Sequence, residues 1–179
     1  MDNPALLPES LAASAWVAKW AFMIPHGGRV LDLAAGSGRH TKLLAESGYC
    51  VEAVDRDISG LAECAVLPAV NIHEHDLELG VWPYAKGHFS GIVVTNYLHR
   101  PLFPSLINAL APGGVLIYET FAKGNEVYGR PANPDFLLRP GELLDVVRGQ
   151  LRVIAFEDIY TSEPKAAMVQ RICAMLPVA

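Results

Sequence analysis

The sequence predicts a single α/β domain built around a doubly wound, mostly parallel sheet, and three observations support this fold. An apolar run at residues 30–33 is followed by a glycine-bearing turn and a helical pattern that ends at Gly48. Further short apolar runs alternate with helical patterns along most of the chain, which is the order typical of β-α-β units. The last two apolar runs follow one another directly, and this predicts a terminal hairpin.

The composition is that of one globular domain. The chain has 179 residues, of which 51% are hydrophobic and 18% charged, enough to bury a substantial core. A formal net charge of −5 argues against a nucleic-acid partner, because such partners need clustered Lys and Arg. Cys50, Cys64 and Cys173 are widely spaced and form no C-x-x-C pair, so we expect no metal site and a cytoplasmic location. The chain shows neither a signal peptide nor an apolar run long enough to span a membrane, so we expect no membrane partner.

Residues 1–27 predict an N-terminal helix. Its pattern opens with a cap at Ser10 and ends at Pro25 and the glycines that follow it. Trp16 and Trp20 lie one turn apart on one face. This face either packs on the sheet or closes over a bound ligand, and in the second case Trp16 contacts the substrate.

The stretch from Arg29 to Gly48 predicts a strand, a glycine-bearing turn and the start of a helix, where free backbone N–H groups attract polar or anionic groups. A second strand at 49–54 ends in Asp55, whose carboxylate suits the two hydroxyls of a ribose. Nicotinamide-dinucleotide proteins and S-adenosylmethionine proteins share this arrangement. The dinucleotide fingerprint G-x-G-x-x-G requires a third glycine where this chain has Thr41.

The remaining elements follow from apolar patterns and from Pro and Gly breakers. Asp76 follows a predicted third strand, and residues 96–100 follow a fourth strand that is apolar enough to be central. We expect helices at 57–67, after Pro101 and at 141–149, and strands at 69–75, 89–95, 115–119, 151–160 and 166–176.

Residues 122–140 carry no periodic pattern. A loop of this length in a small domain is usually functional or disordered. Its aromatic and charged side chains, Tyr128, Arg130 and Phe136, favour a lid over the substrate rather than a solvated linker. We therefore expect Tyr128 and Arg130 to contact the substrate.

The spacing Asp32-x-x-x-Gly36-x-Gly38 resembles motif I of class I S-adenosylmethionine-dependent methyltransferases, with Ala34 in place of the first glycine. The resemblance covers almost the whole chain, including Asp55, the Pro112-Gly113-Gly114 turn and the terminal hairpin. It implies a Rossmann-like sheet of seven strands in the order 3-2-1-4-5-7-6, with strand seven antiparallel. Within the superfamily the chain is most similar to small bacterial methyltransferases related to the tellurite-resistance group. These lack added substrate domains, so we expect residues 1–179 to form one domain.

The resemblance also implies the cofactor and its site. S-adenosylmethionine would be bound and S-adenosylhomocysteine released. In the family an acidic residue at the position of Asp76 binds the adenine amino group, and an apolar neighbour packs on the ring. The alternative is that Asp76 caps a turn. The expected cofactor-binding residues are Asp32, Ala34, Gly36, Ser37, Gly38, Asp55, Arg56, Asp76, Leu77 and Asn96.

The reaction expected is transfer of a methyl group to a small-molecule acceptor by in-line attack, accelerated mainly by proximity and alignment. A base is needed only if the nucleophile carries a proton. His99 is the first candidate, followed by Tyr97 and Glu119, and Asn96 would face the methyl group. In the competing interpretation, His99 and Arg100 merely cap the neighbouring helix.

Two other functions stay open. The chain could bind the cofactor without catalysing transfer, or it could be a nicotinamide-dependent oxidoreductase. Thr41 at the third fingerprint position and the lack of a Tyr-x-x-x-Lys pair argue against the second. The sequence contains no signal for an oligomeric state.

Overall fold

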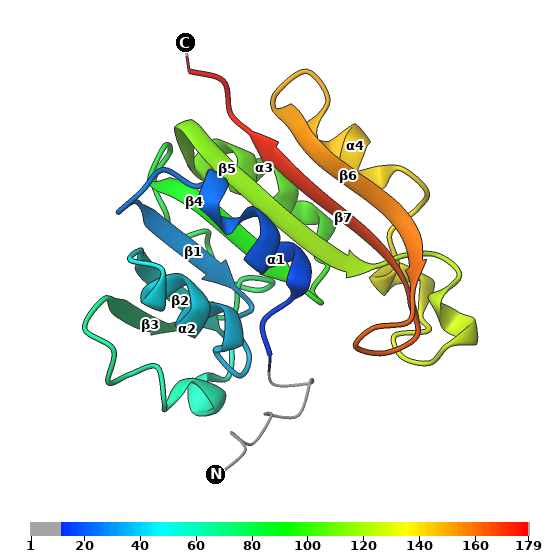
Figure 1. Ribbon diagram of the computed structural model, residues 1–179, viewed down its shortest axis with the longest axis horizontal. Coiled ribbons are helices and arrows are strands. Elements are labelled where there is room, and N and C mark those ends of the chain that lie inside the picture. The colour runs from blue at the N-terminus through cyan, green and yellow to red at the C-terminus, as the bar shows by residue number, and fades with distance from the viewer. Residues whose placement is uncertain (1–11, 179) are drawn as a thin grey trace, which may run out of the picture.

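A seven-stranded mixed sheet forms the centre of the protein (Figure 1). The computed structural model describes residues 12–178. The strands lie in the order β3-β2-β1-β4-β5-β7-β6, which confirms the predicted fold class. Their bounds are β1 Arg29–Leu33, β2 Cys50–Asp55, β3 Val70–Glu74, β4 Phe89–Thr95, β5 Leu110–Phe121, β6 Arg152–Thr161 and β7 Ala167–Met175.

The direction of the strands brings their carboxyl ends together. The five strands from β3 to β5 pair in parallel along the sheet, whereas β7 is antiparallel to both β5 and β6. After β1 the chain moves outward to β2 and β3, then returns to place β4 on the other side of β1. Loops after β1 and β4 diverge at this point, which is where open α/β sheets bind ligands.

Helices cover both faces of the sheet. Figure 1 shows α1 and α2 on one face and α3 and α4 on the other. Alternate strand residues supply the two cores: Val30 and Val93 pack with the first pair of helices, and Leu31 and Ile92 with the second. The helices are α1 Ala15–Trp20, α2 Arg39–Glu46, α3 Phe103–Ala109 and α4 Glu142–Val147.

The N-terminal helix is shorter than predicted. Ser14 caps α1, because its hydroxyl oxygen accepts hydrogen bonds from the backbone amides of Trp16 and Val17. A 3-10 turn at Ala21–Met23 follows the helix. The predicted cap at Ser10 lies outside the described residues.

The predicted helix at 57–67 is wrong. The segment forms a 3-10 helix only at Ile58–Leu61, followed by turns. Gly60 lies against the glycine turn, since a Cβ atom on it would be 2.5 Å from the carbonyl oxygen of Gly36. This close approach of two backbones requires glycine and is achieved by a tighter local path than an α-helix.

The segment 122–140 is partly ordered by pairing with its surroundings. Ala122 forms an isolated parallel bridge with Leu138. Within the segment lie two 3-10 helices, Asn125–Val127 and Pro134–Phe136. The strand before it is longer than predicted, since β5 begins at Leu110 and takes in the Pro-Gly-Gly turn as an irregularity of its pairing with β4.

Residues 12–178 contain neither a membrane-spanning helix nor a cluster of side chains suited to a metal ion. No helix there is long and apolar enough to cross a membrane. In the same range, His, Cys, Asp and Glu side chains form no group of three or more that could hold a metal ion.

Candidate cofactor and substrate site

A cavity of about 350 Å³ opens at the carboxyl ends of β1, β2 and β4. Its size is in the range of pockets that take small ligands or cofactors. It lies at the point where the connections after β1 and β4 diverge. The residues lining it are Leu33, Ala34, Val54, Asp55, Arg56, His75, Asp76, Leu77, Glu78, Tyr97 and Phe136.

The turn between β1 and α2 places backbone, rather than side chains, beside this cavity. Ala34 and Gly36 have positive φ angles of 56° and 54°. For a non-glycine residue such as Ala34 this conformation is uncommon and costs free energy. A Cβ atom on Gly36 would meet nothing closer than the carbonyl oxygen of Ala34 at 4.0 Å, so the space on this side of Gly36 is open, although Gly36 is not among the lining residues. The N-terminus of α2 also has no side-chain cap in the described structure.

Asp32 does not face the cavity, and its predicted contact with the cofactor is corrected. The side chain is 1% exposed, and one carboxylate oxygen accepts a 2.6 Å hydrogen bond from the hydroxyl of Thr41 on α2. Burial raises the pKa of Asp32 to about 6, against the opposing effect of the Thr41 hydrogen bond. Asp32 and Thr41 thus join β1 to α2 across the glycine turn and fix its shape.

Asp55 lies at the end of β2 and lines the cavity. Its two carboxylate oxygens accept hydrogen bonds from the backbone amides of Gly36 (2.8 Å) and Asp57 (3.0 Å). Because each oxygen has two lone pairs, one acceptor position on each is left for a ligand. A pair of neighbouring hydroxyls, as in a ribose, matches this arrangement.

Asp76 performs the turn-capping role that the sequence left open as an alternative, and it also lines the cavity. Its Oδ1 atom accepts hydrogen bonds from the amides of Glu78 (2.9 Å) and Leu79 (3.3 Å). Leu77 and Arg56 line the cavity beside it. Asp76 and Leu77 therefore place a carboxylate and an apolar side chain at the same wall of the cavity. Ser37 is exposed on the turn and is not among the lining residues.

The segment after β4 supplies the other end of the cavity. Asn96 has a φ of 54°, and its backbone amide donates to the carbonyl oxygen of Glu119 (2.9 Å). Tyr97 lines the cavity. Burial, followed by the charge of Glu78 and a hydrogen bond to it, raises the pKa of the Tyr97 phenol. Tyr97 therefore stays protonated at neutral pH, and we correct its expected role from base to hydrogen-bond donor.

His99 lies just outside the lining residues. Its Nδ1 atom is 4.0 Å from the carboxylate of Glu78, which does line the cavity. In the competing interpretation His99 and Arg100 cap the next helix, and His99 does occupy the N-cap position, but neither side chain forms a capping hydrogen bond. The 3-10 helix Arg100–Leu102 has no side-chain cap, and the Arg100 side chain binds Glu142.

His40, which no sequence pattern predicted as a site residue, connects α1 and α2 to β4. The backbone amide of Ser14 donates to its Nε2 atom (3.0 Å), so in the neutral ring Nδ1 carries the proton and donates to the hydroxyl of Thr95 (3.2 Å). Burial, helped by the positive charge of Arg39, lowers the pKa of His40 to about 3. A histidine next to Arg39 in a helical pattern carries no sequence signal for this contact.

The residues present fit S-adenosylmethionine on three observations. Ala34 of the glycine turn lines the cavity, Asp55 has unused acceptor positions, and Asp76 with Leu77 forms a polar and apolar pair at the same wall. Comparison with known proteins decides the family. Residues 15–109, more than half of the chain, match the family model described as "Methionine biosynthesis protein MetW".

The chain belongs to the MetW family.

One curated relative and two solved structures extend this result. The protein-L-isoaspartate O-methyltransferase of Chlorobaculum tepidum is 41% identical over 96 residues, which cover 50% of this chain and 43% of that protein. The match thus spans less than half the length of that relative. TehB from Haemophilus influenzae superposes with a TM-score of 0.74 at 19% identity, over 92% of this chain and 62% of that one. An S-adenosylmethionine-dependent methyltransferase from Mesorhizobium loti gives a TM-score of 0.71 at 17% identity, over 92% and 99% of the two chains.

These likenesses confirm the expected superfamily. The fold of this MetW family member is that of class I S-adenosylmethionine-dependent methyltransferases, with TehB among its structural neighbours.

Trp16, which was expected to contact the substrate, lies in the hydrophobic core of this MetW family member and not at the cavity. Trp16 is 3% exposed, its indole N–H donates to the carbonyl oxygen of Ile172 (3.3 Å), and the Arg171 guanidinium lies 5.0 Å from its ring centroid. It packs on the sheet, on the same face as α2, and is not among the lining residues. The sequence allowed this packing role, and it replaces the substrate role.

Tyr128 and Arg130 are also absent from the cavity wall. The Tyr128 ring rests on Tyr160 of β6, with ring centroids 5.2 Å apart, and Arg130 is exposed. Only Phe136, of the three side chains that predicted a lid, lines the cavity. The segment 122–140 thus reaches the cavity through its last part rather than its middle.

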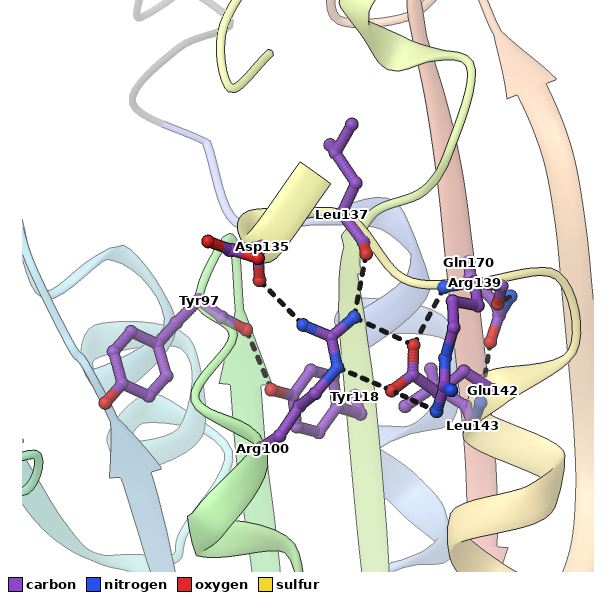
Figure 2. Close-up of polar contacts among 9 residues, drawn as sticks. All are labelled: Tyr97, Arg100, Tyr118, Asp135, Leu137, Arg139, Glu142, Leu143 and Gln170. Atoms are coloured by element: carbon purple, nitrogen blue, oxygen red, sulfur yellow. Dashed lines mark hydrogen bonds and ion pairs between the residues drawn. The ribbon is translucent and has the colours of Figure 1, made fainter. Parts of the chain in front are cut away.

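A cluster around Arg100 holds this last part in place (Figure 2). Arg100 donates to both carboxylate oxygens of Glu142, from Nε at 2.7 Å and from Nη2 at 3.0 Å. Glu142 is 4% exposed and also accepts from the backbone amide of Arg139 (2.8 Å). Burial alone would raise the pKa of Glu142, but the hydrogen bonds from Arg100 and Arg139 lower it to about 2. The pair is therefore charged at neutral pH.

Proposed function

We propose that the protein transfers a methyl group from S-adenosylmethionine to a small-molecule acceptor. The observation that carries this proposal is the continuity of the cavity. One wall offers Ala34 of the glycine turn and the Asp55 carboxylate, which accepts a hydrogen bond from the amide of Gly36, and the other end is bounded by Tyr97 and Phe136. A cofactor and an acceptor placed in the same cavity would meet between these ends.

In this proposal each cavity residue has a separate binding role. S-adenosylmethionine supplies a methyl group activated by a positively charged sulfur. Asp55 accepts hydrogen bonds from the ribose hydroxyls, while Asp76 and Leu77 hold the adenine. The exposed residues Gly36 and Ser37, in the turn that begins at Ala34, lie against the remainder of the cofactor, and the exposed Asn96 lies nearest the methyl group.

The chain's contribution to the reaction is mainly alignment. Holding acceptor and methyl group in line supplies much of the rate without a strong base. Tyr97 is unsuited to remove a proton, because its pKa is raised. His99, beside Glu78 at the edge of the cavity, is the residue we propose as base for acceptors that carry a proton at neutral pH.

A small acceptor fits the position of Phe136 better than a macromolecule does. The 3-10 helix that carries Phe136 adds a wall to the cavity, which restricts access to the end occupied by Tyr97. The net charge of −5 gives no support to RNA or DNA as the acceptor. The three cysteines are all unpaired in the structure, and this supports our proposal that the protein works in the reducing cytoplasm.

The test is release of S-adenosylhomocysteine from S-adenosylmethionine in the presence of small thiols, amines and carboxylic acids, each assayed separately. An isoaspartyl peptide and an RNA pool serve as macromolecular comparisons. We expect release to depend on at least one class of small acceptor. Transfer only to the peptide or to RNA would contradict the small-acceptor proposal, and cofactor binding without any transfer would indicate a non-catalytic binding protein.

A further inference from the structure

The cavity has one wall that the strand ends do not provide. Phe136 is the only lining residue that follows Tyr97 in the described part of the chain. It belongs to the short 3-10 helix Pro134–Phe136, and its side chain is 53% exposed. The sheet fixes the other walls directly, because they lie at strand ends or just after them. Phe136 needs another means of support.

Arg100 provides that support through the backbone on both sides of Phe136. Its Nη1 atom donates to the carbonyl oxygen of Asp135 (2.7 Å), and its Nη2 atom donates to that of Leu137 (2.9 Å). Figure 2 shows the guanidinium between these two carbonyls and the Glu142 carboxylate. A planar guanidinium has several N–H donors in a fixed arrangement and can make all these contacts at once, whereas a lysine ammonium cannot reproduce that arrangement.

Glu142 fixes the guanidinium in turn. It lies in the first turn of α4, its side chain is buried, and its oxygens are 2.7 and 3.0 Å from Nε and Nη2 of Arg100. Gln170 of β7 holds the same region, since its amide nitrogen donates to the carbonyl oxygen of Arg139 (3.0 Å) and its amide oxygen accepts from the amide of Leu143 (2.7 Å). The cluster therefore anchors Phe136 to α4 and to the sheet.

The same segment also holds Tyr97, the other aromatic side chain at this end of the cavity. Tyr97 lies three residues before Arg100, and its carbonyl oxygen accepts a 2.8 Å hydrogen bond from the buried hydroxyl of Tyr118. Residues 97–100 thus position one aromatic ring directly and the other through Arg100.

We propose that Phe136 contacts the bound S-adenosyl ligand and slows its release, and that Arg100 and Glu142 are positioning residues that hold Phe136 at the cavity. This inference rests on the proposed function, because it assumes that the cavity takes an S-adenosyl compound. An aromatic ring held in place before binding loses little conformational freedom when the ligand arrives, so its contact contributes mainly to the dissociation rate.

The experiment measures the dissociation rate of radiolabelled S-adenosylhomocysteine from the full-length protein after a chase with unlabelled compound. The variants are Phe136→Ala, Phe136→Tyr, Arg100→Lys and the double variant Phe136→Ala with Arg100→Lys. Arg148→Lys is the matched control, because Arg148 pairs with Asp145 on the exposed surface of the same region at 2.6 Å. Thermal unfolding of each variant reports separately on stability.

We expect Phe136→Ala to release the ligand about tenfold faster, as the loss of a partly buried aromatic contact predicts. Arg100→Lys should also release it faster, and the double variant should release it no faster than Phe136→Ala alone. Phe136→Tyr and Arg148→Lys should resemble the unmodified protein. An unchanged rate in Phe136→Ala, or additive effects in the double variant, would overturn the inference while leaving the proposed function intact. If the unmodified protein binds no S-adenosylhomocysteine, the proposed function itself fails.

Discussion

Asp32 is a buried carboxylate that stabilises the glycine turn beside the cavity without lining the cavity itself. It lies inside β1, and its hydrogen bond with Thr41 of α2 is formed across the turn that meets the cavity at Ala34. Burial opposes ionisation of this group, which is why the pKa rises to about 6. The hydrogen bond of Asp32 shapes the turn, but burial of the ionised carboxylate lowers the free energy of unfolding near neutral pH.

This cost predicts a pH effect. Because the folded-state pKa of about 6 lies above the ordinary value of 3.8, Asp32 favours the folded state below about pH 4 and loses this contribution as the pH rises through 6. Asp32→Asn keeps an oxygen that can accept the Thr41 hydrogen bond but does not ionise. We expect the free energy of unfolding of the variant, relative to the unmodified protein, to rise by about 2 kcal/mol between pH 4 and pH 7.

Urea unfolding at four pH values across this range measures the difference. His40, whose pKa is lowered to about 3, titrates in both proteins, so its effect cancels. Asp145→Asn, at an exposed ion pair, is the matched control and should show no such trend. Parallel stability curves for Asp32→Asn and the unmodified protein would show that burial does not perturb the carboxylate as described.

At the scale of elements, the turn between β1 and α2 depends on Gly38 for two reasons. Its φ is 74°, and a Cβ atom would lie 2.5 Å from the sulfur of buried Cys64 and 3.0 Å from a methyl carbon of Leu61. Gly149 has a similar φ of 72° but nothing within 4 Å of the corresponding position. The two glycines therefore separate the cost of the backbone conformation from the cost of the clash.

We expect Gly149→Ala to lower the free energy of unfolding by about 1 kcal/mol, since alanine disfavours a positive φ. Gly38→Ala should lower it by about 2 kcal/mol more, because the residues around Cys64 must shift. Only Gly38→Ala should also weaken binding of S-adenosylhomocysteine. Equal destabilisation of the two variants, measured by chemical unfolding, would contradict the packing described for the glycine turn.

The elements that the sequence predicted well are those whose signal is local. Residues 29–48 and the strand at 89–95 combine apolar runs with glycine or turn residues, and the structure confirms them. The helix at 57–67 failed because Gly60 is needed for a contact with a turn more than twenty residues away. The spacing of apolar residues alone could not predict the close contact between the backbones at Gly60 and Gly36.

The same limit applied to the site. Asp55, Asp76 and Leu77 follow strands, so their places at the cavity could be predicted from the parallel sheet. Arg100 and Glu142 are 42 residues apart, and no periodic pattern in the sequence indicates that they pair. For Trp16, the sequence allowed both packing and substrate contact, and only the packing around β5 and β7 distinguishes them.

At the scale of the whole molecule, the strand order creates the site. The return of the chain from β3 to β4 places the segment after β4 opposite the glycine turn after β1, with the cavity between them. The reversed β7 brings Gln170 into contact with Arg139, three residues after Phe136, so the C-terminal hairpin supports the segment that follows the far wall. The order itself came from the resemblance to methyltransferases, because apolar runs do not specify how strands pair.

The central claim is that this cavity binds an S-adenosyl compound through Asp55. Calorimetric titration with S-adenosylhomocysteine, with NAD titrated in parallel, tests it most directly. We expect the unmodified protein to bind S-adenosylhomocysteine and not NAD, and Asp55→Ala to bind it more weakly by roughly 1–3 kcal/mol because the ribose hydroxyls lose their acceptor. Asp145→Ala, at the exposed surface pair, should bind as the unmodified protein does. Binding of NAD alone, or equal affinity in Asp55→Ala, would contradict this account.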